Sequence, residues 1–566
     1  MSKKLLTLSF CLGALLATAQ EEQEATQNKG QLNVGFESNA QWYIDDNKIQ
    51  ISEIDAEERI RSNSYLKLDY YIKNWEFGLQ AESYTPKALL NYAPGLEKTD
   101  VGTIYARYNN TELGLNVTAG HFYEQFGSGL TLRSWEDRQL GINNAIFGGR
   151  VNYDTGTGIN ATILGGKQRI GMGFDLADSF ISGADLGVSI SDMTNMESTD
   201  LSVGASFVSR YENLQDLYPE LDKTTNMYSF RADLTQGNFY IGAEYVYKTD
   251  DALVEGQGVV QDILEEKQYD GNALLVNMGY SQRGFGLDIN LRRMQNIGMF
   301  SERNLTGNTF NTGVVNYVPA LTKQYDFALQ NIYVYQVASV TSFSPYLKPG
   351  EIGGQFDLYY QFKKDTPMGG KHGTYFAVNG SFWNALDYQD LDMENREVSS
   401  GFFDFGRKYY NDLAFEMRKK HSDKWQSIFM VMGQYYNQKY IEDASGELKT
   451  YVAGADVIYK INDIQSIRVI GQHLWADGDK KNWAAGTLEY VPSMKWSFYV
   501  QDLYNYGNDK EDDRIHYYSV GGAFVKGATR IGMSYGRQRG GMICVGGVCR
   551  LVPESSGLTL NISTNF

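Results

Sequence analysis

The sequence predicts an all-β protein: a large antiparallel transmembrane β-barrel of about 24 strands, within roughly 22 to 26, with both termini in the periplasm. Three observations lead to this prediction. Short segments with one apolar and one polar face recur along the chain, tight turns alternate with longer polar loops, and the composition is rich in aromatic residues and glycine. A barrel needs no long apolar run, because only alternate residues of each strand face lipid.

The first residues are typical of an exported protein. Two lysines precede an apolar run from Leu5 to about Ala17, and Ala17-Thr18-Ala19 forms a cleavage motif of small residues. The run is shorter than the roughly 20 apolar residues that a spanning helix needs. We therefore expect residues 1–19 to be a signal peptide, 20–30 a short periplasmic segment and 31–566 the barrel of an outer-membrane protein.

Period-two alternation defines the strands. In residues 284–292, Phe285, Leu287, Ile289 and Leu291 alternate with Gly286, Asp288, Asn290 and Arg292. Residues 238–248, 351–362 and 450–461 repeat this pattern, with Glu244 on the polar face of the first. Each segment predicts a strand with one apolar face.

The connections distinguish a barrel from a soluble β-sandwich. Counted back from the C-terminus, short turns at 526–529, 491–494 and 461–463 alternate with longer polar loops at 506–514, 475–482 and 440–449. This is typical of short periplasmic turns and long extracellular loops. A secreted multi-domain sandwich would instead show linkers and domain-sized repeats, and we see neither. An additional strand pair within 295–349 would raise the count to about 26.

The last strand alternates Leu558, Leu560 and Ile562 with polar residues and ends on Phe566. A terminal aromatic residue of this kind resembles the signal by which outer-membrane barrels are recognised for assembly. We therefore expect the barrel assembly machinery and membrane lipid as partners, and other outer-membrane proteins as further ones. The net charge of −17 argues against a nucleic-acid partner, which would require basic patches.

A barrel of this size encloses a lumen wide enough for water or a plug. The first strand begins shortly after the cleavage site, so we expect no N-terminal plug domain. Two long connections, 124–145 and 295–349, are candidates to fill the lumen or to cover it from the extracellular side. The candidate lumen or constriction residues are Glu124, Arg133, Glu136, Asp137 and Arg138 in the first connection, with Glu244, Asp288 and Arg292 on the wall. The first connection is interpreted as an inward constriction loop, with a solvated surface loop or a chemical site as alternatives.

The sequence carries no familiar catalytic motif. Neither GxSxG, HExxH nor GxxxxGK[ST] occurs, and the five histidines are scattered without metal-ligand spacing. We therefore expect no enzyme activity, no metal and no cofactor.

Cys544 and Cys549 flank a Gly-Gly pair, Gly546-Gly547. A two-residue turn there makes the cysteines a cross-strand pair with Cα atoms about 4.5 Å apart, within disulfide range. Export favours a disulfide. A thiol pair for redox chemistry or metal binding is the alternative.

The stretch YEQFGSGLTLRSWEDRQLGINNAIFGGR, together with CVGGVCRLVPESSGL, resembles an uncharacterised family of outer-membrane proteins from the Bacteroidota, a domain of unknown function. The resemblance covers the mature chain and implies a barrel in the outer membrane of a Gram-negative bacterium. It implies no catalytic or binding residue. We therefore weigh three functions: a porin-like channel for polar solutes, a sealed barrel that serves as a subunit of a larger outer-membrane assembly, and, third, a barrel-embedded enzyme.

Overall fold

The computed structural model describes residues 30–52, 54–55, 58–90, 96–139, 141–213, 221–252, 268–303, 309–316, 323, 325–335, 350–387, 401–442, 444, 446–545 and 548–566. The predicted signal peptide, and all but the last residue of the predicted 20–30 segment, lie outside these residues.

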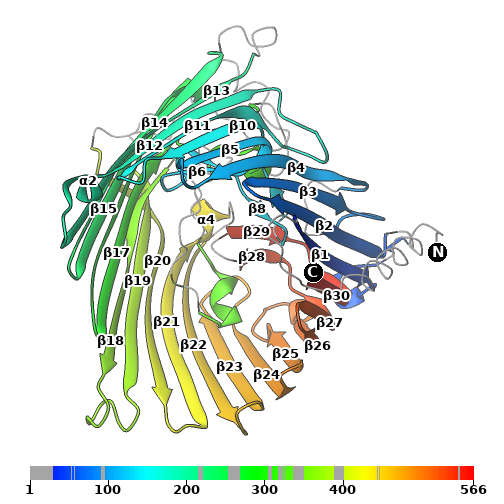
Figure 1. Cartoon of the computed structure of the whole chain (residues 1–566). Coiled ribbons are helices and arrows are strands. Elements are labelled where there is room, and N and C mark those ends of the chain that lie inside the picture. Colours follow the sequence, from blue (N-terminus) through cyan, green and yellow to red (C-terminus); the bar gives the residue numbers. More distant parts are fainter. Residues whose placement is uncertain are drawn as a thin grey trace.

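The chain forms a single ring of 24 antiparallel strands (Figure 1). The ring closes because β1 (Gln31–Tyr43) pairs with β2 (Ile60–Ile72) on one side and with β30 (Ser555–Asn565) on the other. The predicted fold class is therefore confirmed, including the strand number. The other wall strands are β3 (Trp75–Ser83), β4 (Thr99–Asn110), β5 (Leu115–Phe122), β10 (Ile146–Asp154), β11 (Ile159–Gln168), β12 (Phe180–Ser189), β13 (Thr199–Tyr211), β14 (Thr224–Gln236), β15 (Phe239–Ala252), β16 (Gln268–Gln282), β17 (Phe285–Gln295), β18 (Gly350–Phe362), β19 (Thr374–Leu386), β20 (Phe405–Lys420), β21 (Trp425–Asn437), β22 (Glu447–Lys460), β23 (Ser466–Ala476), β24 (Trp483–Ser493), β25 (Trp496–Tyr504), β26 (His516–Lys526) and β27 (Thr529–Gln538).

The remaining described elements are short and belong to the connections. They are β6 (Gln125–Phe126), β7 (Leu132–Arg133), β8 (Glu136–Asp137), β9 (Ile142–Asn143), β28 (Gly541–Val545) and β29 (Val548–Val552), with the helices η1 (Asn47–Ile49), α2 (Ile190–Thr194), α3 (Thr309–Thr312), η2 (Ala328–Ile332), α4 (Gln438–Ile441) and η3 (Glu511–Asp513). Among the described residues, no helix is both long enough and apolar enough to cross a bilayer.

The two ends of the barrel differ in their connections. Gln31 pairs with Tyr71, so the start of β1 lies beside the two-residue turn between β2 and β3. We name this side the turn end, and the opposite side, which carries the long connections, the loop end. The end of β30 also lies at the turn end, because Gly35 pairs with Asn565.

The outer face of the wall carries belts of exposed aromatic side chains near both ends. Trp75, Trp425 and Trp496 are the first residues of their strands at the turn end, and each remains 45–47% exposed. Trp42 and Trp475 occupy the next-to-last positions of β1 and β23 at the loop end and are exposed as well. Belts of this kind lie at the two interfaces of a membrane with water.

The additional strand pair considered for the connection after β17 does not form part of the wall. The count of about 26 strands is therefore wrong. β17 ends at Gln295, β18 begins at Gly350, and the described residues between them contain α3 and η2 and no wall strand. The described apolar residues of this stretch, such as Phe327 and Tyr335, pack inside the barrel instead of facing lipid.

Two apolar clusters lie inside the ring, towards the loop end. The first apolar cluster joins Phe126, Leu130, Leu132, Ile297, Met299, Val314 and Val315 from the connections to the inner wall between β5 and β17. The second apolar cluster joins Tyr325, Phe327, Leu329, Ile332, Tyr333 and Tyr335 to the inner wall between β19 and β26. Burial of these side chains holds the connections inside the barrel.

Candidate functional site: the barrel lumen

Two connections from the loop end enter the lumen. We name residues 123–145 the first plug segment and the described residues of 296–335 the second plug segment. The backbone N–H of Ser128 donates to Glu244 of β15 at 2.9 Å, and the Arg138 guanidinium donates to Glu37 of β1 at 3.2 Å. β15 lies nearly half-way round the ring from β1, so the first plug segment spans the lumen.

The two plug segments are joined by hydrogen bonds that backbone N–H groups of the first segment donate to the second. The N–H of Arg133 donates to the carbonyl of Val314 at 3.0 Å, and the N–H of Asn143 donates to the side-chain oxygen of Asn311 at 2.8 Å. Gln168 of β11 also donates to the carbonyl of Gly313 at 2.7 Å. The segments and the wall therefore form one packed unit.

A buried group of charges fixes the second plug segment to the wall. We name Arg210, Glu212, Lys248, Asp251 and Arg303 the ionic anchor. Asp251 accepts hydrogen bonds from Arg210 at 2.7 Å and from Arg303 at 2.8 Å, and all three side chains are 0–2% exposed. Lys248 donates to the carbonyl of Gly298 at 2.8 Å. Burial raises the pKa of Glu212, which accepts from the backbone N–H of Arg303 at 3.1 Å.

A second buried contact involves the predicted residue Arg292. Its guanidinium donates to Glu351 at 2.9 Å and lies 4.2 Å from the ring centre of Trp383. The hydroxyl of Tyr335 donates to the other oxygen of Glu351 at 2.7 Å. Arg292 therefore helps to hold the second plug segment in place.

Glu136 and Arg138 come together at the wall of β1 to β3. Gln80 donates to Glu136 at 2.6 Å and accepts from Arg138 at 2.9 Å. Burial lowers the pKa of the Arg138 guanidinium, but Glu136 and Glu37 outweigh that effect and the net change is upward. Arg138 therefore carries its charge at the edge of the plug.

The other predicted residues lie elsewhere in the lumen. Glu124 contacts Arg150 of β10, and Asp137 accepts from the backbone N–H of Gln139. The Arg133 guanidinium lies 4.2 Å from the ring centre of Trp135, and burial lowers its pKa. Asp288 lines a separate cavity on the inner wall. The eight predicted residues therefore do not form one constriction ring.

Several residues that bind the plug were not among those predicted from the sequence. Strand alternation places Glu37 and Gln80 on the inner face, so they could have been found. Glu82 shares the face of Gln80, but its buried contact with Arg169 at 2.7 Å and the contacts that assemble the ionic anchor have no such signal. Both depend on where a loop folds back.

A polar cavity of about 530 Å³ separates the plug from the wall formed by β27, β30, β1 and β2. We name it the polar passage. It follows β30 from Ser563 near the turn end to Ser555 at the loop end, which corresponds to about 27 Å of strand. Its charged lining residues are Glu37, Arg138 and Arg530.

The predicted cysteine pair lies in the hairpin of β28 and β29, which is separate from the wall. The backbone register places Cys544 opposite Cys549, but their side chains are outside the described part of the structure. The disulfide therefore stays a prediction. We expect the unreduced protein not to react with iodoacetamide at these residues and to react at both after reduction, as read by peptide mass spectrometry. Alkylation without reduction would contradict the disulfide.

Within the described residues, no three histidine, cysteine or acidic side chains gather in an arrangement that could hold a metal ion. Among known proteins, the chain is matched over residues 1–566 by the model of a family of unknown function. The predicted resemblance to an uncharacterised family is thus confirmed. No curated protein matches the chain.

Solved structures with a similar arrangement of strands include a siderophore receptor, an usher pore and a porin. The siderophore receptor PirA from Pseudomonas aeruginosa has a TM-score of 0.41 and 8% identity, over 96% of this chain and 81% of that one. The translocation pore of the P pilus usher PapC has a TM-score of 0.43 and 7% identity, over 94% and 99%. A BenF-like porin from Pseudomonas fluorescens Pf-5 has a TM-score of 0.33 and 9% identity, over 84% and 99%.

Proposed function

This chain belongs to the DUF6029 family, whose function is unknown, and we propose that it is a porin-like channel for small polar solutes. Its place is the outer membrane of a Gram-negative bacterium, with the turn end in the periplasm and the loop end outside the cell. The aromatic belts on the outer face and the short turns at one end support this placement. The export of the chain by a signal peptide is part of the same proposal.

The polar passage is the observation that supports a channel. Its lining combines three charged side chains with amides and hydroxyls such as Asn39, Gln41 and Thr559. Groups of this kind replace part of the hydration shell of a polar solute as it moves along the wall. The polar passage lies along β30 between Ser563 and Ser555, whereas the apolar clusters fill the lumen beside it.

A second candidate function follows from these same apolar clusters. If the plug also closes the polar passage, the barrel is sealed and acts as a structural subunit of a larger outer-membrane complex. Its partners would then be other membrane proteins. In either role we propose that the chain acts without catalysis and without a cofactor.

For the channel and for the sealed subunit alike, the proposal includes insertion into the outer membrane by the barrel assembly machinery through the C-terminal strand. The backbone of Phe566 exchanges hydrogen bonds with Val34 of β1 at 2.8 and 3.1 Å, beyond the last paired residue of β30. The terminal aromatic residue therefore lies at the seam where the ring closes. We propose that the barrel assembly machinery recognises this strand.

The ion selectivity of the channel tests whether current follows the polar passage. Glu37, Arg138 and Arg530 give its lining a formal net charge of +1, and Arg530→Glu changes this to −1. A unit charge contributes about 1 kcal/mol for an ion about 4 Å away in water. We therefore expect the cation-to-anion permeability ratio of Arg530→Glu to rise about fivefold or more, as read from reversal potentials in a salt gradient.

The matched control is Arg418→Glu on β20, which makes the same change of charge on a distant part of the inner wall. We expect a smaller shift in the reversal potential from this variant. Equal shifts from both substitutions would mean that ions do not pass along β27 and β30.

A further inference from the structure

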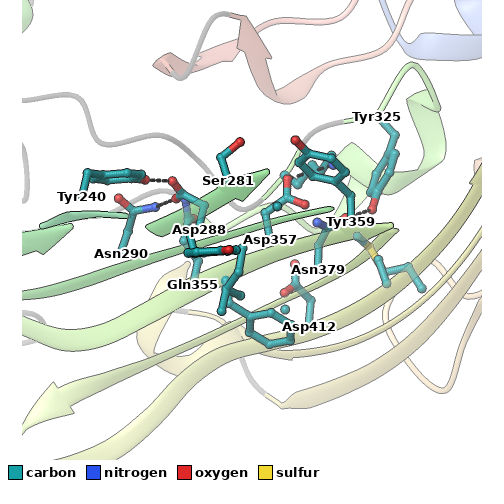
Figure 2. Close-up of a pocket in the computed structure, with 18 residues that line it drawn as sticks. Tyr240, Ser281, Asp288, Asn290, Tyr325, Gln355, Asp357, Tyr359, Asn379 and Asp412 are labelled. Atoms are coloured by element: carbon teal, nitrogen blue, oxygen red, sulfur yellow. Dashed lines mark hydrogen bonds and ion pairs between the residues drawn. The ribbon is translucent and has the colours of Figure 1, made fainter. Parts of the chain in front are cut away.

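Figure 2 shows a second cavity, which has a volume of about 500 Å³. It lies on the inner wall between β15 and β21, across the ring from the polar passage. We name it the wall cavity. Asp288, Asp357 and Asn379 extend into it from the strands, and Tyr325 comes from the second plug segment above them. Lys323 of the same segment also lines it. The wall cavity is thus built partly by the barrel and partly by the plug.

The strand register aligns its polar residues in rows across the wall. Asp288 on β17 pairs with Asp357 on β18, which in turn pairs with Asn379 on β19. Two residues further towards the loop end, at the next inward-facing position, Asn290 pairs with Gln355. Carboxylates and amides therefore lie side by side at about 5 Å spacing, the distance between neighbouring strands.

Three buried polar atoms of this lining have no hydrogen-bond partner. They are the side-chain oxygen of Gln355, one carboxylate oxygen of Asp357 and the amide nitrogen of Asn379. Asn379 is only 4% exposed, and its own oxygen accepts from the Tyr325 hydroxyl at 2.5 Å. Most buried polar atoms in proteins are hydrogen-bonded, because an unmade bond is costly. The wall cavity therefore has two hydrogen-bond acceptors and one donor that a bound solute could use.

The charge of the lining is negative. Asp288, Asp357 and Asp412 contribute three formal negative charges and Lys323 one positive charge, which leaves −2. Lys323 donates to one oxygen of Asp357 at 2.9 Å, and the other oxygen of Asp357 is the unpartnered one. Asp288 already accepts from Tyr240 and Asn290. The unused carboxylate oxygen of Asp357 thus favours a cationic donor.

Aromatic rings complete the lining. Tyr240, Tyr325 and Tyr359 all border the wall cavity, and Tyr359 is stacked on Tyr375 with ring centres 5.6 Å apart. The face of a tyrosine ring attracts a nearby cation and also packs against carbon–hydrogen groups. Rings and carboxylates together match a small organic cation.

We propose that the wall cavity binds a small organic amine that carries an oxygen acceptor beside its ammonium group. The ammonium group donates hydrogen bonds to the free oxygens of Asp357 and Gln355. The oxygen acceptor of the solute accepts a hydrogen bond from the side-chain amide of Asn379. This inference does not depend on the proposed channel, because the wall cavity and the polar passage lie on different walls. A neutral polyol is the competing ligand, since hydroxyl groups also donate and accept.

Isothermal titration calorimetry of the detergent-solubilised full chain distinguishes the two chemistries. Glucosamine and ethanolamine serve as amine probes, and glucose serves as the neutral counterpart of glucosamine. We expect glucosamine to bind with a dissociation constant of roughly 1 mM or lower, and glucose to bind at least about tenfold more weakly. Equal binding of the two sugars, or no binding of either amine, would overturn the proposal.

A charge-neutralising pair of variants locates the site. Asp357→Asn keeps the shape of the side chain but removes the carboxylate, so we expect glucosamine binding to weaken about tenfold. The control is Asp233→Asn on β14. Asp233 faces the lumen, as Arg231 two residues earlier does, but it does not line the wall cavity. Unchanged binding in Asp357→Asn, or an equal loss in Asp233→Asn, would place any amine site elsewhere. Heat-dependent mobility in electrophoresis and circular dichroism establish that both variants are folded.

Discussion

Replacing residues 296–349 with a short glycine-serine turn is expected to raise the single-channel conductance about tenfold, because it removes the second plug segment from the lumen. Gln295 and Gly350 pair directly across β17 and β18, so a short turn can close this hairpin without disturbing the wall. The replacement removes the second plug segment from both apolar clusters. It also leaves the first plug segment without two hydrogen-bond acceptors, the carbonyl of Val314 and the side-chain oxygen of Asn311.

The control for this variant is replacement of residues 509–513 by glycine and serine. These residues lie in an exposed loop at the loop end, where Asp509 and Glu511 have side chains 75% and 88% exposed. We expect the conductance of the control to match that of the unmodified protein. If the 296–349 replacement folds but conducts no more than the control, the second plug segment does not occupy the lumen in the membrane.

The second large effect is expected from Asp251→Asn, which breaks the ionic anchor. Arg210, Lys248 and Arg303 would then remain buried with Glu212 as the one carboxylate of the anchor. Removing one partner of a buried ion pair costs about 3 to 5 kcal/mol, since the other charge stays out of water. We expect the second plug segment to detach more often, which would appear as faster hydrogen exchange at residues 298–303 and as more frequent openings in current recordings.

The comparison for this variant is Asp423→Asn at the turn end. Asp423 is paired with Lys420 at 2.8 Å, but its side chain is 87% exposed. Exposed pairs contribute little because water screens them, so we expect a change within about 0.5 kcal/mol. Similar hydrogen exchange at 298–303 in Asp251→Asn and in Asp423→Asn would show that the ionic anchor does not hold the plug.

Strand alternation made the wall predictable from the sequence. Each segment with period two, such as Phe285 to Gln295, presents one apolar face, and the connections between such segments alternate in length. These local signals fix the number of strands and their direction. They also place Glu244, Asp288 and Arg292 on the inner face, because successive side chains of a strand point to opposite sides.

The lumen was less predictable, because its contacts join residues far apart in the chain. The first plug segment attracts attention through its charges, but nothing in its sequence pairs Arg138 with Glu37 or Arg133 with the carbonyl of Asn316. The apolar residues from Tyr325 to Tyr335 resemble a strand locally. Only the surrounding wall shows that they pack inside the barrel, since both a lipid-facing strand and a buried loop require apolar side chains.

Single-channel recording of the unmodified full chain in a planar bilayer tests the central claim most directly. The polar passage is expected to give a stable open current that is smaller than that of the 296–349 replacement and that changes its ion selectivity in Arg530→Glu. No current from the unmodified protein, with a large current from the replacement, would contradict a channel. The barrel would then be sealed by its own plug, as in the second candidate function.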